Sequence, residues 1–365
     1  LQARLALLRT AIHVRAPAPL AATAASIAAR AAGTVRFDAA RFAHEVLALY
    51  TAHAPLAERH SAAFVAHAAA QWAALVDADA AHAPAAARLE RLRAYLETFA
   101  AFRHPAAMHD APAMKQRFLD ACAHPELAVQ RAALDSLLAW RDAWLEHHAD
   151  LLRGLLDPAR FRDTLAQADL SAASEQIGAA ERAEVMGVVV RVLYGLMVSR
   201  RGQRTSGAGQ KARRAAILSA LYAAAPADLG LLVDLMLASL GDAAGHVAGG
   251  VFVPGVPAAP ARKQLGMLQL LGDVLRHLGR PLAPSLPRLV GVTVSLAAAA
   301  CDDARREVRR AALRRLADLV PFDGIDWAVF APPLLALVRP RLATFAADSL
   351  QAPSALLDLV RAWAT

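Results

Sequence analysis

The chain has 365 residues, of which 57% are hydrophobic but only 5% aromatic, so its apolar content is mostly Ala and Leu, which favour helices. Its two cysteines, Cys122 and Cys301, lie far apart and outside any Cys-x-x-Cys motif, which argues against a disulfide framework or zinc cluster and fits a reducing compartment. The formal net charge of +8 favours an acidic partner, either a nucleic-acid backbone or an acidic protein surface, without choosing between them.

Residues 1–104 have the apolar spacing of amphipathic helices but no distinctive motif. Apolar residues recur every three or four positions, as at Phe42, Val46 and Tyr50. Along the whole chain, prolines separate such stretches at intervals that suit helices of about three to five turns. They include Pro55, Pro84, Pro105, Pro125, Pro158, Pro226, Pro281, Pro321 and Pro353. The pattern predicts paired helices joined by short turns.

A metal site is the first chemistry to consider in this region, because His53, His60 and His67 recur every seven residues and could share one helical face. Pro55 argues against a single helix through all three, and no Cys or carboxylate completes a ligand set. We therefore expect solvated or core histidines and no bound metal.

Two segments resemble each other: residues 125–134 (PELAVQRAAL) and residues 304–313 (ARREVRRAAL). In each, a short turn leads into a helix whose Val packs inward and whose Ala pair permits close approach to a neighbouring helix. This pattern is typical of an all-α HEAT/armadillo-type helical repeat solenoid, with a compact helical bundle as the alternative. We expect more than half of the residues to be helical, with essentially no sheet.

Short β-like runs at residues 188–190 and 290–294 lie inside longer helical patterns and are expected to be helical. No domain boundary is marked. Every long apolar run is broken before it reaches the ~20 residues that cross a bilayer, so no membrane span is predicted. Arg191, Tyr194 and Gly195 are expected to be structural: Gly195 allows close helix approach, Tyr194 packs with its hydroxyl satisfied, and Arg191 pairs within the helix stack.

Two segments interrupt the helical pattern. Residues 241–260 are rich in Gly, Pro, Val and Ala, lack periodicity and are predicted to be loop. Ser199–Arg214 contains three glycines and no acid and is predicted to be a mobile loop. It carries six cations, which are Arg200, Arg201, Arg204, Lys211, Arg213 and Arg214. We call Ser199–Arg214 the basic segment.

The basic segment is the candidate binding site of the chain. Each of its cations could displace a counterion from RNA phosphate, or contact an acidic protein. Because no aromatic residue is interleaved for base stacking, RNA contact would be directed to the backbone and blind to sequence. The alternative is a solvated connector between repeats.

No motif points to catalysis. Gly202 and Gly207 have the glycine spacing of a phosphate-binding loop, but Ala208 stands where that motif has Lys, and no Ser or Thr follows to hold magnesium. A Gly-x-Ser-x-Gly elbow is also absent from the sequence. The mixture of acids and arginines at residues 302–310 is typical of a solvated helix face. We predict no catalytic residue, no cofactor and no small-molecule substrate.

From about His104 to the end, a series of motifs stands in an order that matches one known family. They are His124-Pro125 with Val129-Gln130 and Ala133-Leu134; residues 155–161; residues 191–197 (RVLYGLM); residues 213–218 (RRAAIL); residues 262–266 (RKQLG) running to Leu278-Gly279; residues 339–342 (RPRL); and residues 349–351 and 354–357. On these motifs the chain resembles an internal fragment of the giant HEAT-repeat protein of the small-subunit processome, the down-regulated-in-metastasis family (U three protein twenty).

The resemblance implies a non-catalytic scaffold in ribosome biogenesis. It implies a nuclear, nucleolar protein that helps to assemble pre-ribosomal RNA, the U-three small nucleolar RNA and other processome proteins, without a membrane. Residues 1–104 are then Ala-rich helical repeats that do not align with the family, and residues 105–365 are the repeats that resemble it. A general protein-interaction or transport-receptor solenoid is the alternative, since the same repeats would support it.

Overall fold

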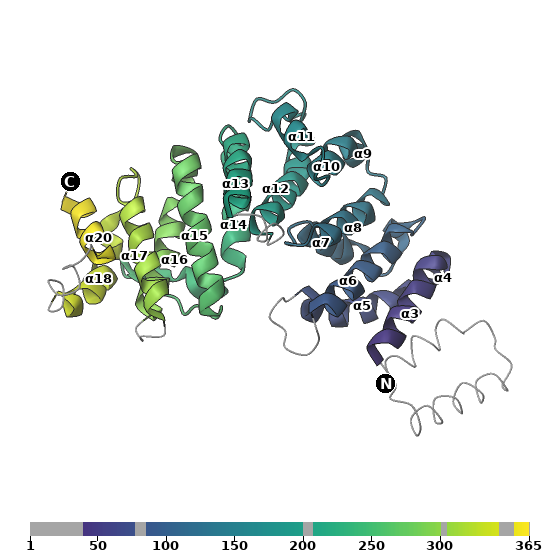
Figure 1. The fold of residues 1–365 in the computed structure, drawn as a ribbon, viewed down its shortest axis with the longest axis horizontal. Coiled ribbons are helices and arrows are strands. Elements are labelled where there is room, and N and C mark those ends of the chain that lie inside the picture. The colour runs from purple at the N-terminus through teal and green to yellow at the C-terminus, as the bar shows by residue number, and fades with distance from the viewer. Residues whose placement is uncertain (1–38, 77–84, 200–206, 301–304, 343–353, 365) are drawn as a thin grey trace, which may run out of the picture. The chain divides into compact units, whose positions relative to one another are not determined.

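A computed structural model describes residues 39–76, 85–199, 207–300, 305–342 and 354–364 (Figure 1). Helices account for most of these residues, so the predicted all-α fold, with more than half of the residues helical, is confirmed. The chain divides into two compact units. The first unit comprises residues up to Thr164 and Arg191–Arg201, and the second comprises Leu165–Val190 and the residues from Gly202 onward.

The chain crosses between the units three times. Two crossings fall inside helices, α11 (Phe161–Gln167) and α12 (Arg182–Val198), so the sequence marked neither, and the third, after Arg201, lies outside the described residues. No composition shift or linker accompanies a boundary of this kind.

Helix pairs build the first unit. Helices α3, α6 and α8 are successive neighbours, while α5 packs on α6 and α7 packs on α8 (Figure 1). The elements are α3 (Ala39–Ala52), α4 (Ala54–Arg59), α5 (Ser61–Val76), α6 (Ala85–Ala100), the 3-10 turn η1 (Pro105–Ala107), α7 (Ala111–Ala121), α8 (Leu127–Leu138), α9 (Ala143–His147) and α10 (Ala149–Leu155).

Aromatic rings concentrate in the core of the first unit. The fully buried Phe64 ring lies 5.3 Å from the ring of Tyr50 and 5.1 Å from that of Phe99. Phe99 in turn lies 5.2 Å from Phe118. Tilted pairs at these distances are favourable beyond the area they bury. These four rings therefore join α3, α5, α6 and α7 into one core.

The second unit has two layers. Helices α13, α15, α17 and α20 are successive neighbours and form the first layer, and α14, α16 and α18 form the second (Figure 1). The elements are α13 (Gly207–Leu221), α14 (Pro226–Ala238), η2 (Asp242–Ala244), α15 (Ala261–Leu278), η3 (Arg280–Ser285), α16 (Leu286–Ala299), α17 (Arg306–Leu319), α18 (Trp327–Val338), η5 (Arg339–Arg341) and α20 (Ala355–Ala364).

Both β-like runs are helical, as predicted. Residues 188–190 lie in α12 and residues 290–294 in α16, and every side chain of these runs is buried. Burial among neighbouring helices outweighs the mild preference of Val for strands.

The predicted loop at 241–260 is wrong in part, because it contains a β-hairpin. Strands β1 (His246–Ala248) and β2 (Val251–Val253) pair antiparallel, with Val247 opposite Phe252. Gly249 and Gly250 connect them with φ of 55° and 78°, the left-handed values that a tight hairpin turn requires. Phe252 anchors the hairpin by packing 5.0 Å from the ring of Phe330 in α18.

One described segment, Arg280–Ala299, is long and apolar enough to cross a membrane by length and composition. It spans η3 and α16, and 61% of its most apolar stretch is buried inside the protein. A helix buried in the core of a folded protein has the same length and composition, and α16 is such a core helix.

Candidate functional site

The structure divides the basic segment. Arg200, Arg201 and Arg204 lie outside the described residues, whereas Lys211, Arg213 and Arg214 lie in α13. The prediction of loop up to residue 214 is therefore wrong from Gly207 onward. Beyond the glycines, Gln, Lys, Ala and Arg are strong helix formers, and Ile217, Leu218 and Leu221 bury the apolar face of this helix.

Arg214 has a partner within the fold. Its Nη1 lies 3.3 Å from Asp273 Oδ2 of α15, and the two side chains are only 21% and 17% exposed. Arg276 contacts the other oxygen of Asp273 at 3.3 Å. Arg214 therefore helps to join α13 to α15, while Lys211 remains exposed at the start of α13. Contact between the basic segment and a partner stays a prediction.

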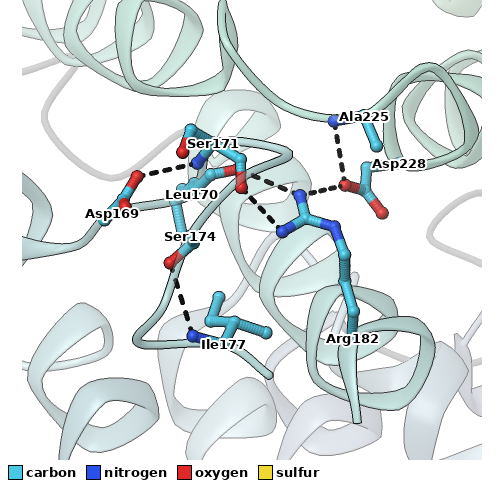
Figure 2. Close-up of polar contacts among 8 residues, drawn as sticks. All are labelled: Asp169, Leu170, Ser171, Ser174, Ile177, Arg182, Ala225 and Asp228. Atoms are coloured by element: carbon cyan, nitrogen blue, oxygen red, sulfur yellow. Dashed lines mark hydrogen bonds and ion pairs between the residues drawn. The ribbon is translucent and has the colours of Figure 1, made fainter. Parts of the chain in front are cut away.

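A buried ion pair dominates the polar interior of the second unit (Figure 2). Arg182 at the start of α12 donates to Asp228 Oδ2 at 2.7 Å, and the two side chains are 14% and 9% exposed. The same guanidinium donates to the backbone carbonyls of Ser171 at 2.7 Å and Leu170 at 3.1 Å. Arg182 thereby joins the segment between α11 and α12 to the first turn of α14.

Further hydrogen bonds engage the other polar groups around Arg182 and Asp228. Asp228 also accepts from the Ala225 N–H at 3.2 Å, which caps the start of α14. Asp169 accepts from the Ser171 N–H at 3.0 Å, and Ser174 accepts from the Ile177 N–H at 3.3 Å (Figure 2). Asp228, Asp169 and the Ser174 hydroxyl are therefore engaged with the backbone or with Arg182. The arrangement stabilises the fold and has no nucleophile paired with a base.

Sequence reasoning missed this pair because Arg182 and Asp228 are 46 positions apart. One local signal was present: Pro226 followed by Asp228 is typical of a helix start, and it marks α14 correctly. Nothing local identifies Arg182 as its partner.

A second polar cluster joins α8 to the end of α12 within the first unit. The fully buried Gln130 donates to the carbonyl of Cys122 at 2.7 Å and to that of Val192 at 3.0 Å. Gly195 makes this possible, because a Cβ there would collide with Gln130 Nε2 and would lie 2.6 Å from the carbonyl oxygen of His124. Arg191 Nε lies 3.7 Å from Asp120 Oδ1. The predicted structural roles of Gly195 and Arg191 are confirmed, and the satisfied hydroxyl of Tyr194 stays a prediction.

Two titratable groups of this cluster are uncharged at neutral pH. Burial lowers the pKa of His124 to about 4, and its Nδ1 accepts from the Glu126 N–H at 3.0 Å, which requires an unprotonated nitrogen. Burial raises the pKa of the Cys122 thiol to about 12. Neither group is therefore poised for acid–base or nucleophilic chemistry near pH 7.

His124 makes the stability of the chain pH-dependent. Above its unfolded pKa of 6.5 both states are neutral, but as the pH falls toward 4 the unfolded state takes up a proton that the native state excludes. We expect the free energy of unfolding to fall over this window by as much as about 3 kcal/mol. Comparing denaturant unfolding at pH 7 and pH 4.5 in wild type and in His124→Asn, which keeps an acceptor, measures this contribution. Identical pH dependence in both proteins would contradict it.

The three regularly spaced histidines do not form a metal site. His53 lies in the turn before α4, His60 in the turn before α5 and His67 inside α5, so the break expected at Pro55 is confirmed. His67 instead contacts Gln71 at 2.9 Å. Among the described residues, no group of three or more His, Cys, Asp or Glu is placed to hold a metal ion.

Paired helices in stacked layers, joined by structural polar clusters, define an α-helical repeat protein. The chain belongs to the family described as U3 small nucleolar RNA-associated protein 20, N-terminal, which it matches over residues 86–365. This confirms the resemblance drawn from the motifs, and the match begins within the region where those motifs gave no alignment. The division of the chain at residue 104 stays a prediction.

Two relatives share the name "U3 small nucleolar RNA-associated protein 20". The Schizosaccharomyces pombe protein is 28% identical over 273 residues, which is 69% of this chain. The Saccharomyces cerevisiae protein is 24% identical over 289 residues, or 74% of this chain. In both cases the chain spans about 11% of the length of the relative.

Proposed function

We propose that this chain is a non-catalytic scaffold segment of the small-subunit processome, acting in ribosome biogenesis in the nucleolus. The observation that carries the proposal is the family match over residues 86–365, since the family is described by its association with U3 small nucleolar RNA. Stacked helix pairs support it physically, because they present long surfaces that bind by area and charge rather than by a pocket.

The proposed scaffold role also predicts the binding partners of the chain. Processome proteins would bind along the helical surfaces, and pre-ribosomal RNA and U3 RNA would be contacted directly or through those proteins. The interior agrees with a scaffold: Arg182 and Gln130 hold helices together, and the buried His124 and Cys122 are uncharged at neutral pH.

Recovery of RNA from cells tests the proposal. The tagged chain, purified from cells after crosslinking, should enrich U3 RNA and small-subunit precursor RNA relative to an unrelated helical repeat protein carrying the same tag. Recovery of cargo proteins without these RNAs would favour the general protein-interaction or transport-receptor alternative instead.

The basic segment remains the candidate for direct RNA contact. Replacing Arg200, Arg201, Arg204, Lys211 and Arg213 by Ser, while keeping the Arg214–Asp273 pair, should weaken RNA binding by the purified chain and flatten its dependence on salt by roughly 0.7 per lost phosphate contact. Binding titrations at several salt concentrations measure both effects. If wild type and variant give the same affinities and slopes, the segment is a solvated connector.

A further inference from the structure

Charge is distributed unequally between the two layers of the second unit. Helices α13, α15 and α17 together hold eleven Lys or Arg and three Asp or Glu. Helices α14, α16 and α18 hold only Asp228, Asp234 and Arg288. Asp228 is paired with Arg182, and Asp234 is paired with Arg288. These three helices of the first layer are therefore strongly basic, and the second layer is almost neutral.

The cations of α13, α15 and α17 are accessible: all eleven are exposed or half-buried. Apolar residues of the same helices face inward, as Leu271 of α15 and Leu316 of α17 do, both fully buried. Each helix is therefore amphipathic, with its apolar side buried within the unit and its charged side toward solvent. On α17, Arg306, Arg310 and Arg314 are all exposed at i, i+4 and i+8, so they form one row with a rise of about 6 Å per step.

Contacts between helices join these charges into one surface. Arg214 of α13 reaches Asp273 of α15 at 3.3 Å. The guanidinium of Arg315 in α17 lies directly over Gly272 of α15 and pairs with Asp318 at 3.0 Å. Within these three adjacent helices, Lys and Arg outnumber Asp and Glu by eleven to three. We call this surface, the outward side of α13, α15 and α17, the basic face.

We propose that the basic face binds the phosphate backbone of RNA, an inference that rests on the proposed function and assigns it a surface. Nine of the eleven cations are Arg, whose planar fork matches phosphate oxygens and forms paired hydrogen bonds. Charge spread over three helices, rather than gathered in a pocket, fits a long polyanion with regularly repeated charges. The three helices contain no Phe, Tyr or Trp, so recognition is by backbone and shape rather than by base stacking.

The test uses the full chain with Arg276, Arg310 and Arg314 replaced by Gln, which preserves helix propensity. Arg276 is 59% exposed, and Arg310 and Arg314 are also exposed, so their loss should not disturb the core. The matched control replaces Arg59, Arg103 and Arg162 of the first unit by Gln, because these residues are exposed and their loss changes the net charge equally. Circular dichroism and thermal unfolding verify that both variants fold as the wild type does.

The readout is binding to a fluorescently labelled single-stranded RNA of mixed sequence over a range of salt concentrations. We expect the basic-face variant to lose roughly tenfold or more in affinity near physiological salt and about 2 in the slope of log Kd against log salt, at ~0.7 per phosphate contact. The control should stay close to wild type. Equal binding by the two variants would overturn the proposal.

Two further outcomes separate this inference from the proposed function. Charge-dependent binding of polyglutamate with no binding of RNA would assign the basic face to an acidic protein and also overturn the inference. If the basic-face variant loses RNA affinity in vitro but still recovers U3 RNA from cells, the basic face stands as an RNA surface, and cellular association also depends on protein contacts. If the wild type binds RNA in vitro but recovers no U3 or precursor RNA from cells, the proposed function fails while the surface remains.

Discussion

Replacing Gly195 by Ala is expected to lower the free energy of unfolding by about 3 kcal/mol, because the added methyl group has no room. It would collide with Gln130 Nε2 and lie 2.6 Å from the carbonyl oxygen of His124 and 3.0 Å from the carbonyl carbon of Ala123. Two of these three atoms are backbone, so a rotamer change cannot relieve the clash. Helix α12 would have to move away from α8, which would also stretch the hydrogen bond from Gln130 to Val192.

Gly266 provides the matched control for this substitution. It also lies inside a helix, α15, but a Cβ there meets no atom within 4 Å. Gly266→Ala should therefore stabilise the chain by about 0.5–1 kcal/mol through helix propensity alone. Denaturant unfolding of both variants, followed by circular dichroism, compares them directly. If Gly195→Ala proved as stable as Gly266→Ala, the close approach of α12 to α8 would be wrong.

Loss of Arg182 is expected to have the other large effect. Arg182→Met keeps much of the side-chain volume but leaves Asp228 buried without its cation and two backbone carbonyls without their donor. Breaking a buried pair in this way costs roughly 3–5 kcal/mol. Thermal or denaturant unfolding would show the loss as a lower midpoint.

An exposed pair in the same chain tests the cause of this loss. Arg160 and Asp150 lie 3.1 Å apart, but their side chains are 51% and 85% exposed, and Arg160→Met should have little effect on stability. The double variant Arg182→Met with Asp228→Leu should recover part of the loss, because it removes the uncompensated charge. Equal destabilisation by Arg182→Met and Arg160→Met would show that burial of the pair does not matter.

Helical content and the close approach at Gly195 could be predicted because both depend on residues that are near one another in the sequence. Apolar spacing fixes helix faces, and a glycine within a Val- and Leu-rich helix is typical of tight packing. The same local rules failed where glycines precede strong helix formers, so the start of α13 at Gly207 was interpreted as loop. They failed again at Gly249 and Gly250, where a Gly- and Pro-rich stretch concealed a hairpin anchored by Phe252.

The basic face was harder to predict because its three helices become neighbours only in the folded chain. The arginines of α17 resemble any solvated helix face when that helix is considered alone. In the structure these arginines belong to a larger basic surface, because α15 lies between α13 and α17, and Arg214 and Arg315 both reach α15. Which helices share a layer depends on how successive helix pairs pack against each other, and no short stretch of sequence shows this.

Because the two compact units share α12, the chain resists simple dissection for biochemical work. A shortened chain ending at Thr164 would keep Gln130 but would lack the Val192 carbonyl that it bonds and Gly195, against which it packs. The Gln130 amide, which is buried in the full chain, would then be exposed to solvent. One beginning at Leu165 would keep Arg182, Leu170, Ser171 and Asp228 together. Truncations that aim to isolate the first unit should therefore extend to Val198, and soluble expression should depend on that choice.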